Sequence, residues 1–207
     1  LNTLDSSTRS TLQHNLIHLD EYSKTQLLDI LNDRITYVFY ENTVSTQTLD
    51  LIAEDAALEG GDARYAIELL WRAGKYADAD NSREVLPEHV RRASESVYPV
   101  VRKDAIFELS LHEKLFLLGV ARRFKQSSAA YLSMGEAENA YAVVCEEYGE
   151  EKRGHNQLWK YVQGLSAIDV IKTEPSSVGL RGKTTLISLP HVSAAELERE
   201  LSKTLGA

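Results

Sequence analysis

The sequence predicts a mostly α-helical protein that carries one β-hairpin near its C-terminus. Serine followed three residues later by Gln or Glu, the pattern of a helix capping box, recurs before stretches with apolar residues at helical spacing. These boxes begin at Ser23, Ser110, Ser133 and Ser193. Short β-branched stretches stand out only between residues 169 and 189. With 43% hydrophobic residues in a chain of 207, a packed core in one or two domains is expected.

Residues 22–98 are expected to form a purely helical domain. Asp62 can cap a helix, and Pro87 suits the first position of another. Pro99 marks a plausible boundary, because a residue before proline disfavours helix. The expected apolar faces are Leu27, Ile30, Leu31 and Ile35 in the first helix, Ala63, Ile67, Leu70 and Gly74 after Asp62, and Val90 and Ala93 after Pro87.

Residues 101–207 are expected to run helix, helix, helix, hairpin, helix. The helix after Ser110 has Leu111, Leu115 and Leu118 at helical spacing. Three helices followed by a hairpin is the order of a winged helix-turn-helix. In that fold the third helix enters the major groove of DNA, and the hairpin, or wing, touches the backbone or the minor groove.

The third helix of this unit is expected from His155 to Ala167. Leu158, Val162 and Leu165 share one side, with Tyr161 beside them, which predicts the side that faces the core. The opposite side carries Asn156, Lys160 and Gln163. Asn and Gln can bond adenine edges, and Lys can reach guanine or phosphate. Trp159 lies at the border, where packing at the core edge and contact with nucleic acid are both open.

The stretch "SVGLRGKTTLISL" (177–189) contains Gly182-Lys183-Thr184, the three residues with which a P-loop motif ends. A P-loop needs a glycine where this chain has Ser177, and it must open a helix. Thr185–Leu189, ended by Pro190, is typical of a strand, and Val170–Thr173 of a second one. Residues 174–181 would connect them as a hairpin. Arg181 and Lys183 would then lie at its tip.

The charge distribution is uneven. The net charge is −8, and residues 1–100 account for all of it. Residues 152–183 are locally basic, with Asp169 and Glu174 as the opposing acids. The basic residues are Lys152, Arg153, Lys160, Lys172, Arg181 and Lys183. Such a stripe on an acidic chain favours nucleic-acid binding, although an ordinary solvated face has the same composition.

Several classes of site are disfavoured. One cysteine, Cys145, excludes a disulfide framework or a cysteine-rich zinc site and is expected to be a small buried hydrophobe. His14 and His18 have i, i+4 spacing but lack the acid of a zinc-protease motif. No Ser/His/Asp arrangement can be argued, so the chain by itself is not expected to be an enzyme. No apolar run is long enough for a membrane span and no signal peptide opens the chain, so a cytoplasmic, nucleoid-associated location is expected.

Arg64, in Gly60-Gly61-Asp62-Ala63-Arg64, breaks a local rule. A cation in the first turn of a helix opposes the helix dipole. It gains if an anion comes to meet it, and a nucleotide phosphate would serve. The alternative is a surface ion pair with Asp62 or Glu68.

These residues carry a resemblance to a known family. "GGDARYAIELLWRAGKYA" (60–77) and "REVLPEHVRRA" (83–93) resemble the lid domain of archaeal origin-recognition/cell-division-control initiators, which are AAA+ proteins. "LDSSTRSTLQ" (4–13) and "YSKTQLLDILNDR" (22–34) resemble the segment that leads into that lid. "LSLHEKLFLLGVAR" (109–122) resembles the first helix of the family's winged-helix domain. The resemblance spans nearly the whole chain.

The resemblance implies residues 1–21 as the tail of the AAA+ core, 22–100 as the lid and 101–207 as the winged-helix domain. It implies that Arg64 is the sensor 2 arginine, which reaches ATP or ADP with Mg²⁺ on the core of the full-length protein. It implies origin recognition, with double-stranded DNA, the replicative helicase and other initiator subunits as partners and no membrane. The DNA-binding residues would be Arg153, Asn156, Lys160, Gln163, Arg181 and Lys183.

The chain also departs from the family. It shows no P-loop and no Walker B strand, so it should neither bind nor hydrolyse ATP by itself. Family members often carry an arginine at the place of Ser7, and Arg9 lies two residues later. Two alternatives stay open: a winged-helix transcription regulator, or a protein-docking module with a helical partner domain. A regulator would need a ligand pocket or dimer face in residues 22–98.

Overall fold

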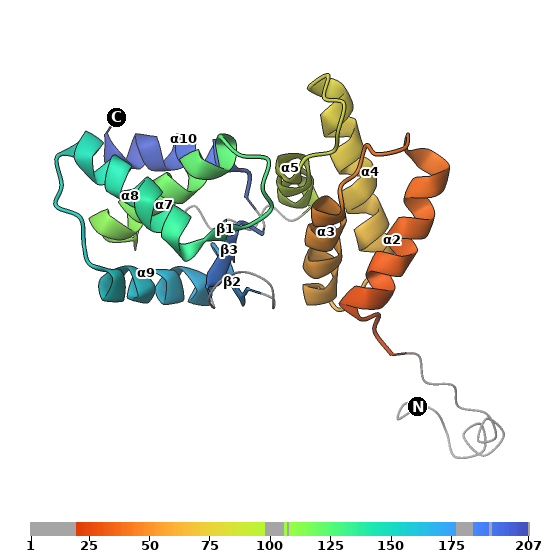
Figure 1. Ribbon diagram of the computed structural model, residues 1–207, viewed down its shortest axis with the longest axis horizontal. Coiled ribbons are helices and arrows are strands. Elements are labelled where there is room, and N and C mark those ends of the chain that lie inside the picture. Colours follow the sequence, from red (N-terminus) through yellow and green to blue (C-terminus); the bar gives the residue numbers. More distant parts are fainter. Residues whose placement is uncertain (1–19, 98–105, 107, 177–183, 191, 207) are drawn as a thin grey trace, which may run out of the picture.

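The computed structural model describes residues 20–97, 106, 108–176, 184–190 and 192–206. They form two lobes side by side, which we call the helical domain and the winged-helix domain (Figure 1). Each lobe has its own cluster of buried apolar side chains. Pro99, the expected boundary, lies outside the described residues, as do Ser7, Arg9, His14 and His18.

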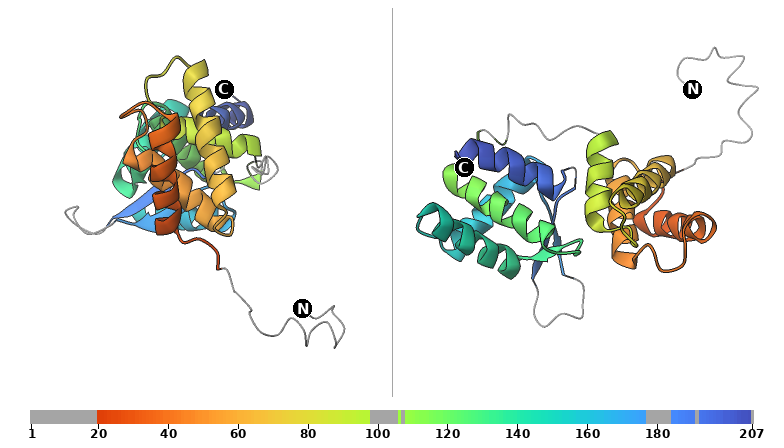
Figure 2. Two further views of the ribbon diagram at one scale, coloured as in Figure 1. Left: turned by 90° about the vertical axis from the view of Figure 1, so that its right-hand side faces the viewer. Right: turned by 90° about the horizontal axis from the view of Figure 1, so that it is seen from above.

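The helical domain consists of α2 (Lys24–Val38), α3 (Thr46–Leu58), α4 (Ala63–Ala79) and α5 (Pro87–Val97). The capping box at Ser23 is confirmed, since the Ser23 hydroxyl accepts from Gln26 N and the Gln26 side chain accepts from Ser23 N. Pro87 is the first residue of α5, as the sequence predicts. In two views α5 lies next to the winged-helix domain (Figures 1 and 2).

Gly61 sets the start of α4. Its φ is +67°, and an added Cβ would lie 2.5 Å from the carbonyl oxygen of Tyr22, so only glycine fits there. The turn delivers Asp62 as N-cap, where its carboxylate accepts from the backbone N–H groups of Arg64 (2.8 Å) and Tyr65 (3.2 Å). The Gly-Gly-Asp segment is therefore a helix-starting turn that lies against the backbone of Tyr22, two residues before α2.

The buried face of α4 differs from the predicted one. Ala63, Ile67 and Gly74 are half-buried, and of the four predicted residues only Leu70 is buried. The buried residues of α4 are Tyr65, Ala66, Leu69, Leu70, Ala73 and Ala77. The reason is that α4 packs against α5 and α3 together, which rotates and widens its buried stripe.

In the winged-helix domain Ile106 already belongs to the buried core, and the helices α7 (Leu111–Lys125) and α8 (Met134–Tyr148) follow it. At their crossing a Cβ on Gly119 would lie 2.8 Å from the backbone nitrogen of Tyr141, so this glycine allows the close approach. Leu115 and Leu118 are buried as predicted, but Leu111 is 44% exposed because it is the first residue of α7. Cys145 on α8 is buried, which confirms its prediction.

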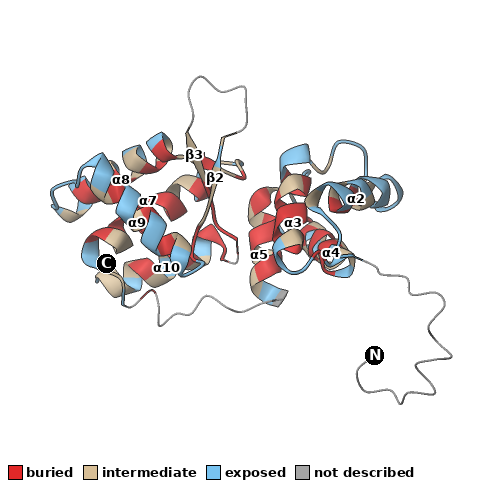
Figure 3. Ribbon diagram, turned by 90° about the horizontal axis from the view of Figure 1, so that it is seen from below, coloured by how far each residue is buried: buried red, intermediate tan, exposed pale blue. Residues whose placement is uncertain are grey.

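The domain continues with α9 (His155–Ala167), the strands β2 (Lys172–Pro175) and β3 (Thr185–Ser188), and α10 (Ala194–Leu205). The capping boxes at Ser110 and Ser133 are confirmed, and Ser193 caps α10 by accepting from Glu196 N. Figure 3 shows buried residues on the inner faces of the helices and exposed residues outside. Three helices and a β-hairpin in this order make the predicted winged helix-turn-helix.

The sheet is antiparallel, with the order β1-β3-β2, and β1 (Leu132–Ser133) was not predicted. The hairpin prediction is confirmed for the described residues, with Lys172 opposite Ser188 and Pro175 opposite Thr185. The predicted limits are wrong, because Val170 and Ile171 are buried in the turn after α9 and the strand runs through Pro175. A proline is tolerated there because β2 is an edge strand.

Candidate nucleic-acid interface

Helix α9 is amphipathic, with an apolar face toward the core and a polar face toward solvent. Leu158, Val162 and Leu165 are at most 3% exposed and lie in the core of the winged-helix domain. Asn156, Lys160 and Gln163 are exposed, as the spacing predicts. The inner face fixes the rotation of the helix about its axis, so the three polar side chains must point away from the protein.

A buried hydroxyl fixes the start of α9. Tyr141 on α8 is 1% exposed, and its Oη lies 2.9 Å from Nδ1 of His112 on α7. The same oxygen accepts from the backbone N–H of Arg153, at 3.1 Å, two residues before α9 begins. Burial raises the pKa of Tyr141 to about 12. Tyr141 therefore ties the loop before α9 to both earlier helices of the fold.

The outer face of α9 is hollowed. His155, Asn156, Trp159, Lys160 and Gln163 line an open hollow of about 530 Å³. A second one, of about 360 Å³, lies around the first turn, next to Gly154. His155 also forms an ion pair with Glu138 on α8. Arg153, just before the helix, is exposed. This face is therefore polar, concave and accessible.

The wing rises beside this helix. Ser176 N donates to Thr184 O at 2.8 Å, which continues the hairpin beyond its strands. Thr185–Ser188 is a strand, so no helix follows Gly-Lys-Thr as a P-loop would require. Arg181 and Lys183, predicted at the tip, lie outside the described residues.

Arg64 lies on the other domain. It is exposed in the first turn of α4. The expected alternative, an ion pair with Asp62 or Glu68, is not seen: Asp62 is occupied as the N-cap, and Glu68 holds Arg72 at 2.7 Å. Within the described residues the Arg64 guanidinium forms no ion pair, which leaves it available to an anion.

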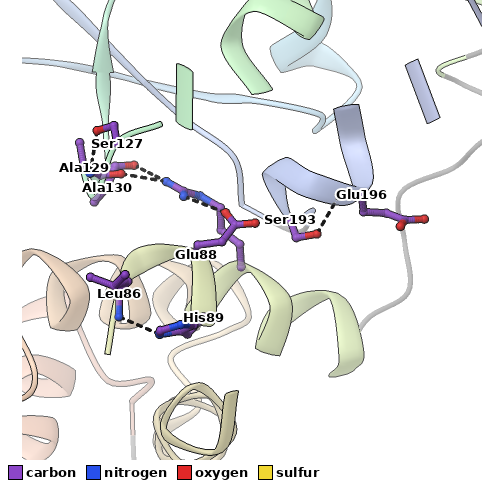
Figure 4. Close-up of polar contacts among 9 residues, drawn as sticks. Leu86, Glu88, His89, Ser127, Ala129, Ala130, Ser193 and Glu196 are labelled. Atoms are coloured by element: carbon purple, nitrogen blue, oxygen red, sulfur yellow. Dashed lines mark hydrogen bonds and ion pairs between the residues drawn. The ribbon is translucent and has the colours of Figure 1, made fainter. Parts of the chain in front are cut away.

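Arg91, which sequence reasoning missed, joins the two domains. It lies on α5 and is 1% exposed. Its Nη2 lies 3.0 Å from the carbonyl oxygen of Ala130 and 3.3 Å from that of Ala129. Figure 4 labels these two accepting residues and Glu88. Its guanidinium stacks over Phe124, 4.2 Å from the ring centre. Glu88 pairs with it at 3.3 Å. Burial raises the pKa of Glu88, and Arg91 opposes that shift.

A cluster of carboxylates and a tyrosine forms a second contact between the domains. Tyr131, just before β1, has its hydroxyl 2.5 Å from Glu54 and 3.1 Å from Asp50, both on α3. Lys24 on α2 lies 3.2 Å from Asp50 and 3.5 Å from Glu54. Burial and then the neighbouring carboxyl of Glu54 raise the pKa of Glu174, on β2, to about 7. The helical domain thus contacts the sheet that carries the wing.

Only one feature of the sequence hints at the contacts of Arg91. Glu88 and Arg91 are three residues apart on α5, which is typical of an ordinary surface pair. Nothing local shows that the winged-helix domain covers them. The partners of Arg91 are backbone carbonyls, which no side-chain pattern can reveal.

The membrane and metal questions can be addressed for the described part. None of its helices is both long and apolar enough to cross a bilayer. Nor do three or more His, Cys, Asp or Glu side chains gather there in a way that could hold a metal ion.

A helical domain whose helix α4 starts at a Gly-Gly-Asp-Ala-Arg turn, followed by a winged-helix domain, is the arrangement of the lid and winged-helix parts of AAA+ initiators. Comparison with known proteins agrees. Residues 28–95 match the Cdc6 AAA+ ATPase-type lid domain, and residues 104–199 match the CDC6 C-terminal winged helix domain. The chain belongs to the archaeal ORC1/Cdc6 family of DNA replication initiators.

Individual relatives give the extent of the match. ORC1-type DNA replication protein 2 of Sulfolobus acidocaldarius is 37% identical over 197 residues, which are 92% of this chain and 48% of that protein. Its counterpart in Saccharolobus solfataricus is 34% identical, over 90% of this chain and 46% of its own length. The crystal structure of Cdc6p from Pyrobaculum aerophilum matches with a TM-score of 0.86 at 35% identity, over 99% of this chain and 54% of that one. The chain thus spans about half the length of these relatives.

Proposed function

We propose that this chain binds double-stranded origin DNA during the initiation of replication, through α9 and the wing. The observation that carries the proposal is the outer face of α9. Asn156, Lys160 and Gln163 are exposed there, on a helix whose opposite side is locked in the core. Asn and Gln suit adenine edges, and Lys suits guanine or phosphate.

Arg153 extends this interface, as do Arg181 and Lys183 at the expected wing tip. Phosphate contacts by such cations supply the sequence-independent part of the affinity. The basic excess of residues 152–183 on a chain with a net charge of −8 agrees with a local DNA-binding face. This face would place the protein on the nucleoid, in the cytoplasm.

The helical domain would act as a nucleotide-sensing lid. In the full-length protein we assign to Arg64 the role of reaching the phosphates of ATP or ADP, held with Mg²⁺ by the AAA+ core. Its exposure, and the absence of an ion-pair partner within the described residues, support this role. The N-terminus of α4 adds a dipole that also favours an anion. The chain by itself would not hydrolyse ATP.

Helicase loading and contacts with other initiator subunits belong to the same proposal. The contacts of Arg91, Tyr131 and Glu174 join the lid to the winged-helix domain and so support coupling between the two domains, not a particular partner surface. A change in the position of the lid would then shift the sheet of the wing and so alter the DNA-binding face.

Two double variants test DNA binding. The probes are a duplex selected by the parent protein from a randomised pool, and a scrambled duplex. Arg181→Ala with Lys183→Ala should weaken binding to both and flatten the salt dependence by about one unit per lost phosphate contact. Asn156→Ala with Gln163→Ala should weaken mainly the selected duplex, by about 1–3 kcal/mol for each lost base contact.

A matched control removes two cations elsewhere. Arg199 and Lys203 lie on α10, on the side of the lobe away from α9 (Figure 1). Changing both to alanine should leave affinity for either duplex close to that of the parent. If both test variants stay folded by circular dichroism and bind like the parent, α9 and the wing are not the DNA-binding face.

A further inference from the structure

The indole of Trp159 lies on the outer side of α9 and not in the core. It is 37% exposed. The rest of its surface is covered, so packing at the core edge and contact with nucleic acid are both compatible with this position. A large apolar side chain is thus partly accessible beside the polar outer face of α9.

The position of Trp159 is specific. It lines the open hollow of about 530 Å³ together with His155, Asn156, Lys160 and Gln163. The four other residues bring hydrogen-bonding or charged groups, and Trp159 brings the apolar surface. It is three residues after Asn156 and four before Gln163, so it is a neighbour of both on the helix surface.

The chemistry of the major groove offers one apolar group. Each base edge there presents donors and acceptors, and thymine alone adds a C5-methyl group. An adenine read by Asn156 or Gln163 belongs to an A·T pair, so a thymine is always near. An exposed indole gains free energy when it covers that methyl, because apolar surface leaves water.

We propose that Trp159 is a specificity-determining residue that contacts a thymine C5-methyl group in the major groove. The inference rests on the proposed DNA binding through α9 and adds a preference that the polar residues cannot supply. Amides recognise adenine, but they do not distinguish thymine from uracil. Only an apolar contact with the methyl group does so.

The first test uses the fluorescence of the indole. The chain has two tryptophans, and the other, Trp71, lies exposed on α4 of the helical domain. Trp71→Phe leaves Trp159 as the only tryptophan. Its emission should change on addition of an alternating dA-dT duplex, and the change should saturate together with the anisotropy of the labelled duplex. In the matched control, Trp159→Phe, the emission of Trp71 should stay constant.

The second test compares the alternating dA-dT duplex with a dA-dU duplex of the same length, which lacks the methyl groups. The parent should bind dA-dT about four-fold more tightly for one buried methyl. Trp159→Ala should abolish this preference while circular dichroism shows an unchanged fold. Trp71→Ala should retain it.

The outcomes separate this inference from the proposed function. If the labelled duplex binds but the emission of Trp159 stays constant, or if the parent binds both duplexes equally, the thymine contact is wrong and DNA binding stands. If Trp159→Ala keeps the preference, another residue recognises the methyl. If neither duplex binds at low salt, both the proposed function and this inference fail.

Discussion

The guanidinium nitrogen Nη2 of Arg91 lies 3.0 Å from the carbonyl oxygen of Ala130, across the boundary between the lid and the winged-helix domain. Ala130 and Ala129 belong to the segment that leads into β1, and β1 pairs with β3, a strand of the wing. Arg91 thus ties α5 of the lid to the sheet that supports the wing. The tie is polar and fully buried, so it should tolerate very little change.

Arg91→Ala should destabilise the protein by about 3–5 kcal/mol, because it leaves the partly buried Glu88 without its partner. It also removes the donors to two carbonyl groups. The free energy of unfolding, from urea titration followed by circular dichroism, measures this. Arg92→Ala is the matched control: Arg92 pairs with the exposed Asp80, so its loss should cost at most about 1 kcal/mol. Equal losses for the two variants would contradict the assigned role of Arg91.

Glu174 should make stability depend on pH. Its pKa in the folded protein is raised from 4.5 to about 7, where Glu54, Asp50 and Lys24 face it from the lid. Between these values the folded state binds a proton that the unfolded state has lost, so this group's contribution to stability falls as pH rises. Below 4.5 and above about 7 its contribution is constant.

Urea titrations across that pH window measure the effect. Glu174→Gln cannot titrate, so the decline should be smaller in this variant than in the parent. Tyr131→Phe, which keeps Glu174, should retain the decline. If the stability of Glu174→Gln declined with pH as steeply as that of the parent, Glu174 would not be the titrating group.

Glu138→Gln should strengthen DNA binding. Glu138 pairs with His155 at the first residue of α9, so a negative charge lies beside the candidate DNA-binding face. Its removal lessens repulsion of phosphate and frees His155. The affinity for any duplex should rise, and more at low salt than at high salt. Glu200→Gln, on α10, is the control and should change affinity little. Weaker binding by Glu138→Gln would indicate that the pair orients α9.

Tyr141→Phe should cost about 1–3 kcal/mol of stability, because His112 and the Arg153 N–H lose a buried partner. It should also weaken DNA binding, since the loop before α9 is no longer held. Hydrogen exchange at Arg153 N–H distinguishes this local effect from general loss of stability. Unchanged exchange there, with weaker DNA binding, would show that Tyr141 acts in another way.

Arg64→Ala should leave DNA binding by this chain unchanged, since Arg64 lies on the lid away from α9. In the full-length protein the same change should weaken ATP binding or hydrolysis. Arg72→Ala, which removes the partner of Glu68 on the same helix, controls for a general effect on α4. Unchanged ATP affinity and hydrolysis in the full-length Arg64→Ala variant would remove the sensor assignment.

Much of the winged-helix domain, and the start of α2 in the helical domain, could be predicted from sequence. Helix α9 has the predicted limits, because the inner face of Leu158, Val162 and Leu165 has clear helical spacing. The boxes at Ser23, Ser110 and Ser133 fixed helix starts through local hydrogen bonds. Interactions between residues within one helical turn can be recognised in the sequence, so these elements could be predicted.

The errors concern residues whose neighbours are distant in sequence. The buried stripe of α4 depends on how α3 and α5 cover it, which no local pattern specifies. Val170 and Ile171 are as apolar as strand residues, but they fill the core from a turn. Arg91 and Glu174 are charged side chains that another domain covers, so their environment appears only once both domains are folded.

The most direct measurement of the central claim is the affinity of this chain for duplex DNA as a function of salt concentration. If α9 and the wing bind DNA, the logarithm of the association constant should fall linearly with the logarithm of the salt concentration, with a slope of about −0.9 for each phosphate contact. The variant with Arg153, Lys160, Arg181 and Lys183 all changed to alanine should have a slope closer to zero. No binding by the parent at low salt, or the same slope for parent and variant, would contradict the account.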